Sequence, residues 1–278
     1  MESALPIIIF FLAHWWGSVF MQTFYLHRYA SHGMFTMSKP WERFFYAMTW
    51  FFQGSSFLNP RAYAWMHREH HAYSDTEKDP HSPHFYTDAG SMMWRTKGYY
   101  HDYVTGRAIT EKRFQAAVPE WPLMDRIGDS WYSRIGFGTA YTLFYIAYAP
   151  HWAWFLLVPI HYLMGPVHGA IVNWCGHKYG YRNFNTRDKS VNMLPVDFLT
   201  LGELFQNNHH RFGQAPNFAK RAWELDPSWP VIRLFHALGI INLDQKPIHL
   251  EDNPPMDDPQ AELAAARAAE AAEAVPAE

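Results

Sequence analysis

Cysteine is almost absent from this chain of 278 residues, in which Cys175 is the only one. A single thiol excludes an internal disulfide, and it also excludes a zinc or iron–sulfur site built from several cysteines. Charged residues are scarce as well, at 18% of the sequence, and the formal net charge is −3. A weakly acidic chain has no electrostatic basis for binding nucleic acid, so we expect no such partner.

The motifs of several common enzyme classes are also missing from the sequence. There is no G-x-G-x-x-G run for a dinucleotide and no P-loop for a nucleotide phosphate. There is no G-x-S-x-G elbow either, so acyl transfer by a nucleophilic serine has no support. We therefore predict no catalytic residues beyond a metal centre, for which the histidines described below are the candidates.

Aromatic residues, by contrast, are abundant, with 13 Trp, 16 Tyr and 21 Phe making up 18% of the chain. Aromatic side chains concentrate at the two interfaces of a membrane. The mean hydropathy of −0.29 is too low for a chain that lies mostly in lipid. Both facts fit a membrane anchor that carries a large polar portion.

Three apolar runs are long enough to cross a bilayer. Residues 5–26 carry no formal charge, and a helix of that length spans about 30 Å, the thickness of a bilayer core. Residues 131–149 and 152–174 predict a transmembrane hairpin, with kinks in its second helix at Pro159 and Gly165. The apolar run 44–58 is shorter, so we expect it to lie in the interface.

These runs predict an all-α integral membrane protein with about three transmembrane helices, one single and two in the hairpin. Residues 1–250 would form the membrane domain, and the acidic, alanine-rich tail 251–278 would be disordered. The polar stretch 72–130 would face solvent, with a helix after Thr110 as its clearest element. Almost all Lys and Arg then lie on one side, which the positive-inside rule places in the cytoplasm. The membrane would be a bacterial inner membrane or the endoplasmic reticulum.

The central histidine group is an H-x-x-H-H run at His67, His70 and His71. On a helix, positions i, i+3 and i+4 share one face, so these three imidazoles are expected to converge on one point. The run HRYASH places His27 and His32 before this group. All of these histidines would lie in a helical cap on the cytoplasmic side of the membrane.

A third group, QNNHH, carries Gln206, His209 and His210 with the same spacing as the central run. Asn173 and His177 are i, i+4 neighbours after the hairpin. Neutral imidazole is the commonest metal ligand in proteins, and repeated clusters indicate more than one metal ion. Packing or helix capping explains one histidine cluster but explains three poorly. The cap is therefore predicted to hold a di-metal site.

Other polar residues lie near these groups in the sequence. Metal-bound histidines usually donate their second N–H to a carboxylate or another acceptor. Candidates for this outer role are Glu69, Asp75, Glu77, Asp79, His81, His84, Asp197 and Glu203. For the residues between 75 and 84, a solvated loop is the alternative. His14, His161 and His168 lie inside the apolar runs, where we favour packing or a substrate tunnel over ligation.

The runs HRYASH, HREHH, NWCGH and QNNHH occur in this order, interleaved with a membrane anchor. The pattern resembles the integral-membrane fatty acyl desaturases, the all-histidine di-iron family that includes stearoyl-CoA desaturase. The resemblance covers roughly residues 5–215. It implies that two iron ions are bound by His27, His32, His67, His70, His71, His177, His209 and His210. It also implies that Asn173 holds a water on one metal ion.

Gln206 departs from the pattern, because the stearoyl-type enzymes have a histidine at that place. A Q-x-x-H-H box is familiar from front-end desaturases and some bacterial relatives. Weak ligation through the amide oxygen and orientation of a water are both open for Gln206.

The implied activity is that of an O2-dependent desaturase, which introduces a cis double bond into a long-chain acyl thioester. Acyl-CoA with a delta-9-like position is the expected substrate, and acyl-lipid is the other candidate. Electrons would come from a separate donor of the cytochrome b5, ferredoxin or rubredoxin type. One alternative is a membrane di-iron hydroxylase of alkyl, sterol or carotenoid substrates. Another is a zinc-dependent membrane hydrolase, which needs only about three protein ligands and an open position.

Overall fold

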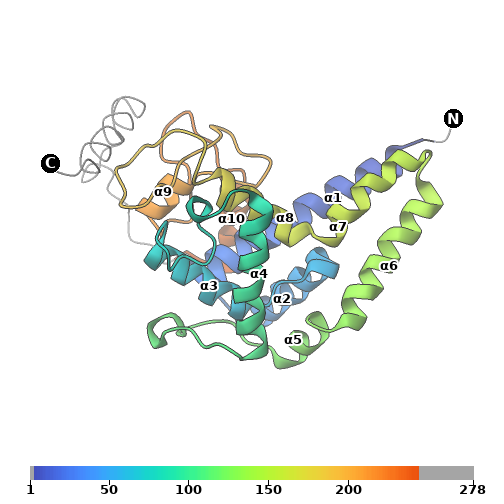
Figure 1. Ribbon diagram of the computed structural model, residues 1–278, viewed down its shortest axis with the longest axis horizontal. Coiled ribbons are helices and arrows are strands. Elements are labelled where there is room, and N and C mark those ends of the chain that lie inside the picture. The colour runs from blue at the N-terminus through green and yellow to red at the C-terminus, as the bar shows by residue number, and fades with distance from the viewer. Residues whose placement is uncertain (1–2, 244–278) are drawn as a thin grey trace.

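The computed structural model describes residues 3–243, and this part of the chain is mostly helical. Figure 1 shows an arm formed by α1, α6 and α7, joined to a broader part that contains α3, α4 and α9. The start of the chain lies at the tip of the arm. The predicted tail 251–278 and the end of the predicted 1–250 domain lie outside the described residues.

Within residues 3–243, six α-helices have ten or more residues. They are α1 (Leu5–Met21), α2 (Lys39–Gln53), α3 (Pro60–Tyr73), α4 (Ala89–Thr105), α6 (Trp131–Tyr148) and α10 (Ser228–Ala237). The shorter α-helices are α5 (Pro122–Gly128), α7 (Val158–Tyr162), α8 (Met164–Ala170) and α9 (Gln206–Arg211).

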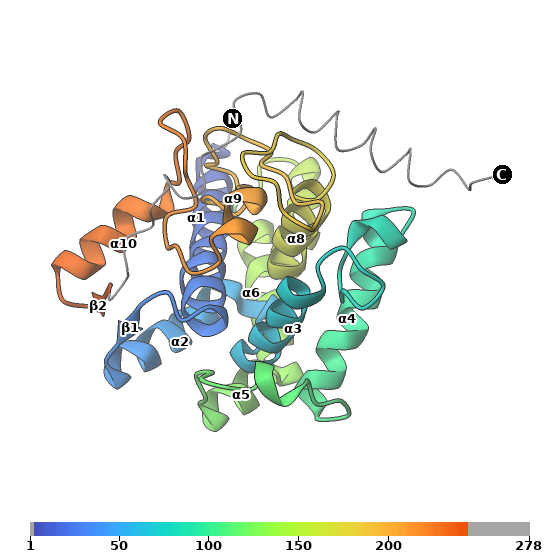
Figure 2. The same cartoon turned by 90° about the vertical axis from the view of Figure 1, so that its left-hand side faces the viewer.

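Tighter and wider helical turns connect these helices. The 3-10 turns are η2 (Gly54–Ser56), η3 (Pro83–Phe85), η4 (Lys112–Phe114) and η5 (Trp152–Leu157). The π-helical segments are η1 (Gln22–Ser31) and η6 (Ile171–Cys175). The strands β1 (Thr36–Met37) and β2 (Ile241–Asn242) pair antiparallel, with Thr36 opposite Asn242. Figure 2 shows this pair and α10 at one edge and α4 at the other, with α1, α3 and α9 between them.

The first helix is longer than the sequence predicts. α1 continues without a break into η1, and the combined helix Leu5–Ser31 is apolar and long enough to cross a membrane. His27 therefore lies on this helix, and His32 is its C-cap residue. The π-helical widening changes the direction in which successive side chains point, and such widening is frequent at functional sites.

The predicted hairpin is present as α6 followed by a broken second helix. The pieces Trp152–Tyr162 and Met164–Cys175 meet at an angle of 78°. The bend lies between Pro159 and Gly165, so the predicted kink is confirmed. Within the described residues, one helix is long and apolar enough to span a membrane, or two if the bent pair is one span. The three crossings stay a prediction.

The predicted helix after Thr110 is wrong, because only the short turn η4 forms there. The clear helix of this region is α4 instead. The side chain of Asp88 accepts a hydrogen bond from the Ser91 amide at its start, and Gly106 ends it in the left-handed conformation with φ 72°. Proline residues follow soon after η4. Because proline in a helix interior breaks the helix, no long helix forms there.

The main apolar core lies in the broad part of the molecule and holds its helices together. It joins η1, α2 and α10 through buried side chains that include Phe24, Tyr46, Phe218 and Ile232. α3 packs against η1. This contact brings the histidines of α3 against those of η1.

Candidate metal centre

α3 carries the central histidine run. Asn59 caps the helix by accepting hydrogen bonds from the amides of Arg61 and Ala62, and Pro60 starts it. The predicted convergence of the three imidazoles on one point is wrong. His67 and His71 point into one cluster and His70 into another, because adjacent helical residues point about 100° apart. One helix thus contributes to both clusters.

The first group, which we call the five-histidine cluster, consists of His27, His32, His67, His71 and His209. One ring nitrogen from each lies within 4.8 Å of all the others. The Nε2 atoms of His27 and His209 are 2.9 Å apart, and the Nε2 atoms of His32 and His67 are 2.8 Å apart. Five nitrogen atoms from η1, the turn after it, α3 and α9 therefore converge on one point.

The second group, the three-histidine cluster, consists of His70, His177 and His210. The Nε2 atoms of His70 and His210 are 3.3 Å apart. Nε2 of His177 is buried and has no hydrogen-bond partner among the described residues. An unpaired buried nitrogen is costly unless something else binds it.

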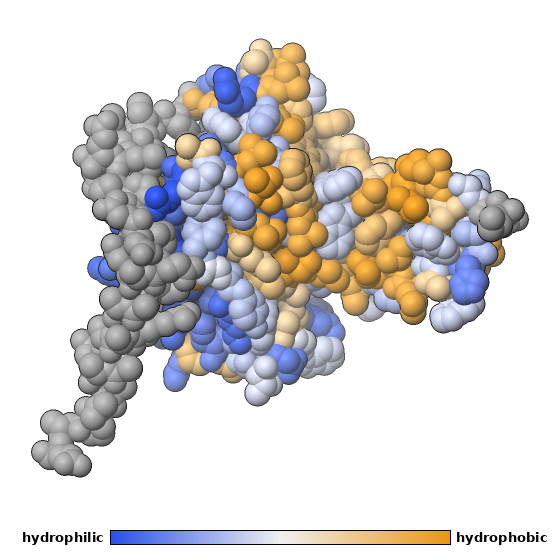
Figure 3. Space-filling model, turned by 90° about the horizontal axis from the view of Figure 1, so that it is seen from above, coloured by the Kyte–Doolittle hydropathy of each residue, from blue (hydrophilic) through white to orange (hydrophobic). Residues whose placement is uncertain are grey.

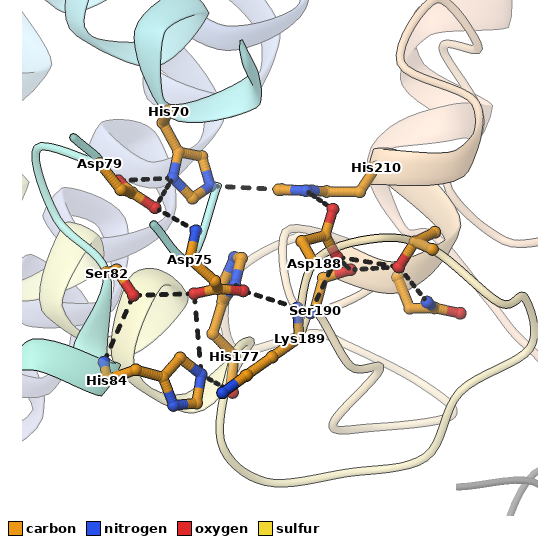
Figure 4. A network of polar contacts seen from close by, with 12 residues as sticks. His70, Asp75, Asp79, Ser82, His84, His177, Asp188, Lys189, Ser190 and His210 are labelled. Atoms are coloured by element: carbon orange, nitrogen blue, oxygen red, sulfur yellow. Dashed lines mark hydrogen bonds and ion pairs between the residues drawn. The ribbon is translucent and has the colours of Figure 1, made fainter. Parts of the chain in front are cut away.

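Each imidazole of the three-histidine cluster is held by its own aspartate, as Figure 4 shows for Asp79 and Asp188. Nδ1 of His70 lies 2.9 Å from Asp79, and Nδ1 of His210 lies 2.9 Å from Asp188. Nδ1 of His177 lies 3.0 Å from Asp75. A carboxylate that accepts a hydrogen bond from Nδ1–H leaves the Nε2 lone pair available for a metal ion.

In the five-histidine cluster, Glu203 takes this part for His27, at 2.5 Å from Nδ1. Glu203 belongs to a larger buried network. The guanidinium of Arg28 donates to Glu203 at 3.2 Å and to Asp226 at 2.8 Å, and its side chain is fully buried. This network ties η1 to the segments on both sides of α9.

Burial favours the neutral form of four histidines in the five-histidine cluster. It lowers the pKa of His32, His67, His71 and His209 well below the usual value for histidine, and the neighbouring imidazoles lower it further. Neutral imidazole is the form that binds a metal ion. Near neutral pH, protons therefore compete little with a metal ion for the ring nitrogens of these four histidines.

The aspartates remain ionised although they are buried. Burial alone would raise the pKa of the Asp79 carboxyl, but His70 beside it lowers that pKa below its usual range. Asp188 behaves in the same way next to His210. His70 shows the reciprocal effect, since burial would lower its pKa but Asp79 raises it. The converging imidazole nitrogens, with carboxylates behind them, fit two metal ions.

All eight histidines singled out in the sequence lie in these two clusters. Asn173 lies on η6, half-buried and four residues before His177. Gln206 is buried on α9, and its amide nitrogen donates to the backbone carbonyl of Glu203 at 2.6 Å. That contact fixes the amide nitrogen and leaves only the amide oxygen of Gln206 as a possible ligand.

The outer residues are only partly as predicted. Asp75, Asp79 and Glu203 contact histidines, but Glu69 instead accepts from Tyr103 and Thr110. The carboxylate of Asp197 accepts hydrogen bonds within its own turn, from residues 200 to 204.

Asp188 was missed by the sequence reasoning, because it is one carboxylate in a polar loop with no spacing that ties it to His210. His84 donates to the backbone carbonyl of His177 at 3.1 Å. Glu77 is exposed, whereas Asp79 and His81 are buried. The stretch around Asp79 to Ser82 is therefore a packed loop and not a solvated one.

The chain matches known proteins over most of its length. A family model described as "Fatty acid desaturase" matches residues 3–233. A "Delta-9 desaturase-like 4 protein" of Arabidopsis thaliana is 28% identical over 82% of this chain and 73% of its own length. An "Icosanoyl-CoA 5-desaturase" of Limnanthes douglasii is 30% identical over 84% of this chain and 63% of its own. An "sn-1 stearoyl-lipid 9-desaturase" of Anabaena variabilis is 27% identical over 77% and 74%, respectively.

Proposed function

Since this chain belongs to the fatty acid desaturase family, and is therefore an oxidoreductase, we propose that it introduces a cis double bond into a long-chain acyl thioester. We propose two iron ions as its cofactor and O2 as its co-substrate. The observation that carries the proposal is the pair of imidazole clusters built on α3, with His67 and His71 in one and His70 in the other.

The ligands of one ion would be the five-histidine cluster and those of the other the three-histidine cluster. Bound iron supplies the oxidising power, drawn from O2, that removes hydrogen from a CH2–CH2 pair without an acidic proton. Asn173 would hold a water beside the three-histidine cluster. Imidazole suits iron, and eight imidazoles exceed the number that a zinc hydrolase needs.

The remaining residues of the centre orient the histidines that would bind the metal ions. Asp75, Asp79 and Asp188 accept hydrogen bonds from the Nδ1–H groups of their histidines, so that each Nε2 keeps its lone pair for a metal ion. Glu203 does the same for His27. Burial of the rings limits the access of bulk water.

For the acyl substrate we propose acyl-CoA with a delta-9-type position. The names of the relatives include an icosanoyl-CoA and a stearoyl-lipid desaturase, which supports a long acyl chain and leaves two carriers to compare. Electrons would come from a separate protein of the cytochrome b5, ferredoxin or rubredoxin type.

We also propose an integral-membrane location with the centre facing the cytoplasm. The surface of the arm is largely apolar in Figure 3, while more of the broad part is hydrophilic. Exposed apolar side chains on the arm include Ile135, Leu143, Ile146 and Leu156. An exposed apolar surface of this kind is suited to lipid contact.

The test is the product formed by the purified protein in detergent, supplied with an electron donor, O2 and either stearoyl-CoA or stearoyl-lipid vesicles. A monounsaturated chain, located by mass spectrometry after derivatisation, is expected from the CoA substrate. The His70→Ala variant should form none, and His101→Ala, which removes an exposed histidine of α4, should keep the activity. A hydroxylated chain would favour the hydroxylase alternative, and product from the lipid alone would overturn the choice of carrier.

A further inference from the structure

One buried histidine is not explained by the eight-ligand centre. His81 lies in the loop after α3 and is only 3% exposed. Neither of its ring nitrogens has a hydrogen-bond partner in residues 3–243. A buried polar group without a partner destabilises a fold, so an unpaired imidazole in this position points to a ligand that is not a protein atom.

His81 lies directly beside the three-histidine cluster. Its ring centroid is 4.3 Å from that of His70, with an angle of 35° between the two planes. His70, Asp79 and His81 form a group of their own, in which one ligand atom of each lies within 4.8 Å of the others, and His70 is the member that this group shares with the three-histidine cluster. Because Asp79 already occupies Nδ1 of His70, the free edge of the His70 ring is the Nε2 edge that faces His210.

The loop holds His81 in place through its backbone. The amide of His81 donates to Asp79 at 3.0 Å, and the amide of Asp75 donates to the same carboxylate at 2.9 Å. The hydroxyl of Thr96 on α4 donates to the carbonyl of Pro80 at 3.2 Å. The carboxylate that orients His70 therefore also positions the backbone of His81.

The two clusters differ in the number of imidazoles that they offer. The first has five and the second has three. Gln206 is on the same helix as His209 and His210, but its amide nitrogen is bound to the Glu203 carbonyl, so it supplies no imidazole. The three-histidine cluster thus has fewer strong donors, and an unpaired imidazole lies next to it.

We propose that His81 is a ligand of the metal ion bound at the three-histidine cluster, where it supplies the fourth imidazole. The centre then contains nine histidines, five in one cluster and four in the other. The assignment rests on the proposed function, because it requires a metal ion in each cluster.

The test is the metal content of the purified full-length protein, produced in iron-supplemented medium and measured as iron per chain. The wild type is expected to hold two iron ions, and His81→Ala about one. His168→Ala is the matched control, because His168 is also fully buried with both ring nitrogens unpaired among the described residues, but it lies beside Trp15. This control should keep two iron ions.

Two further variants separate ligation from packing. His81→Phe keeps an aromatic ring against His70 but has no nitrogen, so it should also hold about one iron ion. Adding Gln206→His to His81→Ala provides an imidazole from α9 and should restore the second ion. Mössbauer spectra of 57Fe-enriched protein should show one iron signal lost and then regained.

Three results are distinguishable. Two iron ions in His81→Ala, with an unchanged Mössbauer spectrum, would overturn the assignment of His81. Loss of iron in His81→Ala but two iron ions in His81→Phe would assign His81 a packing role and overturn it as well. Fewer than two iron ions in the wild type would remove the di-iron proposal itself, and with it the inference.

Discussion

At the scale of single residues, the two clusters are supported differently. Every imidazole of the three-histidine cluster has an aspartate at Nδ1. In the five-histidine cluster Glu203 supports His27, whereas Nδ1 of His209 is buried without a partner among residues 3–243. Ring orientation in the first case depends on charge-assisted hydrogen bonds, and in the second more on packing among the rings.

We predict that Asp188→Ala weakens metal binding at the three-histidine cluster by about 10–100-fold, because His210 loses the acceptor that fixes its ring. Competition with a chelator of known affinity measures the change. Glu77→Ala is the control, since Glu77 is an exposed carboxylate in a loop near the same cluster. Equal affinities in the two variants would show that Asp188 does not orient His210.

Arg28 is the residue on which we expect the fold to depend most. Replacing it with Met leaves Asp226 and Glu203 without their buried cationic partner, which should cost about 3–5 kcal/mol of unfolding free energy. Thermal unfolding in detergent would report this as a lower melting temperature. The pair Lys39–Glu42, in which the lysine is exposed, provides the comparison, and Lys39→Met should change stability by no more than about 0.5 kcal/mol.

At the scale of helices and turns, the sequence predicted which histidines assemble but not how they divide. The spacing in α3 and α9 is a local property, so the five histidines of these two helices were identifiable from it. The full set, with His27, His32 and His177, came from the resemblance to the desaturase family. The division of His70 from His67 and His71 depends on where η1 and the 176–205 segment pack. The extension of α1 through His27 as a π-helix depends on buried tertiary contacts such as that of Arg28 with Asp226, which no local pattern encodes.

The turn after α2 offers a prediction about backbone geometry. Gly54 has φ 51°, and a Cβ added there would lie 1.8 Å from the hydroxyl oxygen of Tyr141 on α6. Gly54→Ala should therefore destabilise the packing of α6 against this turn. Gly33 also has a positive φ, of 62°, but has open space around it.

The same change at Gly33 is thus the matched control for Gly54→Ala. Gly33→Ala should cost about 1 kcal/mol for the backbone conformation alone. Gly54→Ala should lower the melting temperature clearly more. Equal losses in the two variants would show that Tyr141 moves aside freely.

At the scale of the whole molecule, the tip of the arm lies far from the part that contains α9. The start of the chain and the turn between α6 and η5 lie near its tip, far from α9 (Figure 1). Helix α6 leads to this tip, and η5 with α7 returns from it. If the arm crosses the bilayer, the tip and the histidine clusters lie on opposite sides.

Labelling of single cysteines tests this arrangement in a Cys175→Ala background. His151→Cys, at the tip, should react with a membrane-impermeant maleimide in spheroplasts of the expressing bacterium. Lys97→Cys, on the exposed face of α4, should react only after permeabilisation if the broad part faces the cytoplasm, as we propose. The reverse pattern would invert the orientation, and labelling of both sites in intact spheroplasts would contradict a membrane-crossing arm.

The wide spacing of the donors along the chain also has a consequence for biosynthesis. His27 and His209, whose Nε2 atoms lie 2.9 Å apart, are 182 residues apart in the sequence. At a synthesis rate of about 5–20 residues per second, roughly 10–40 s pass between the appearance of the two. Neither cluster is complete until α9 has left the ribosome. If the clusters hold iron, neither site can be completed before most of the chain has been synthesised, and a ribosome that stalls before Gln206 yields a chain with no complete centre.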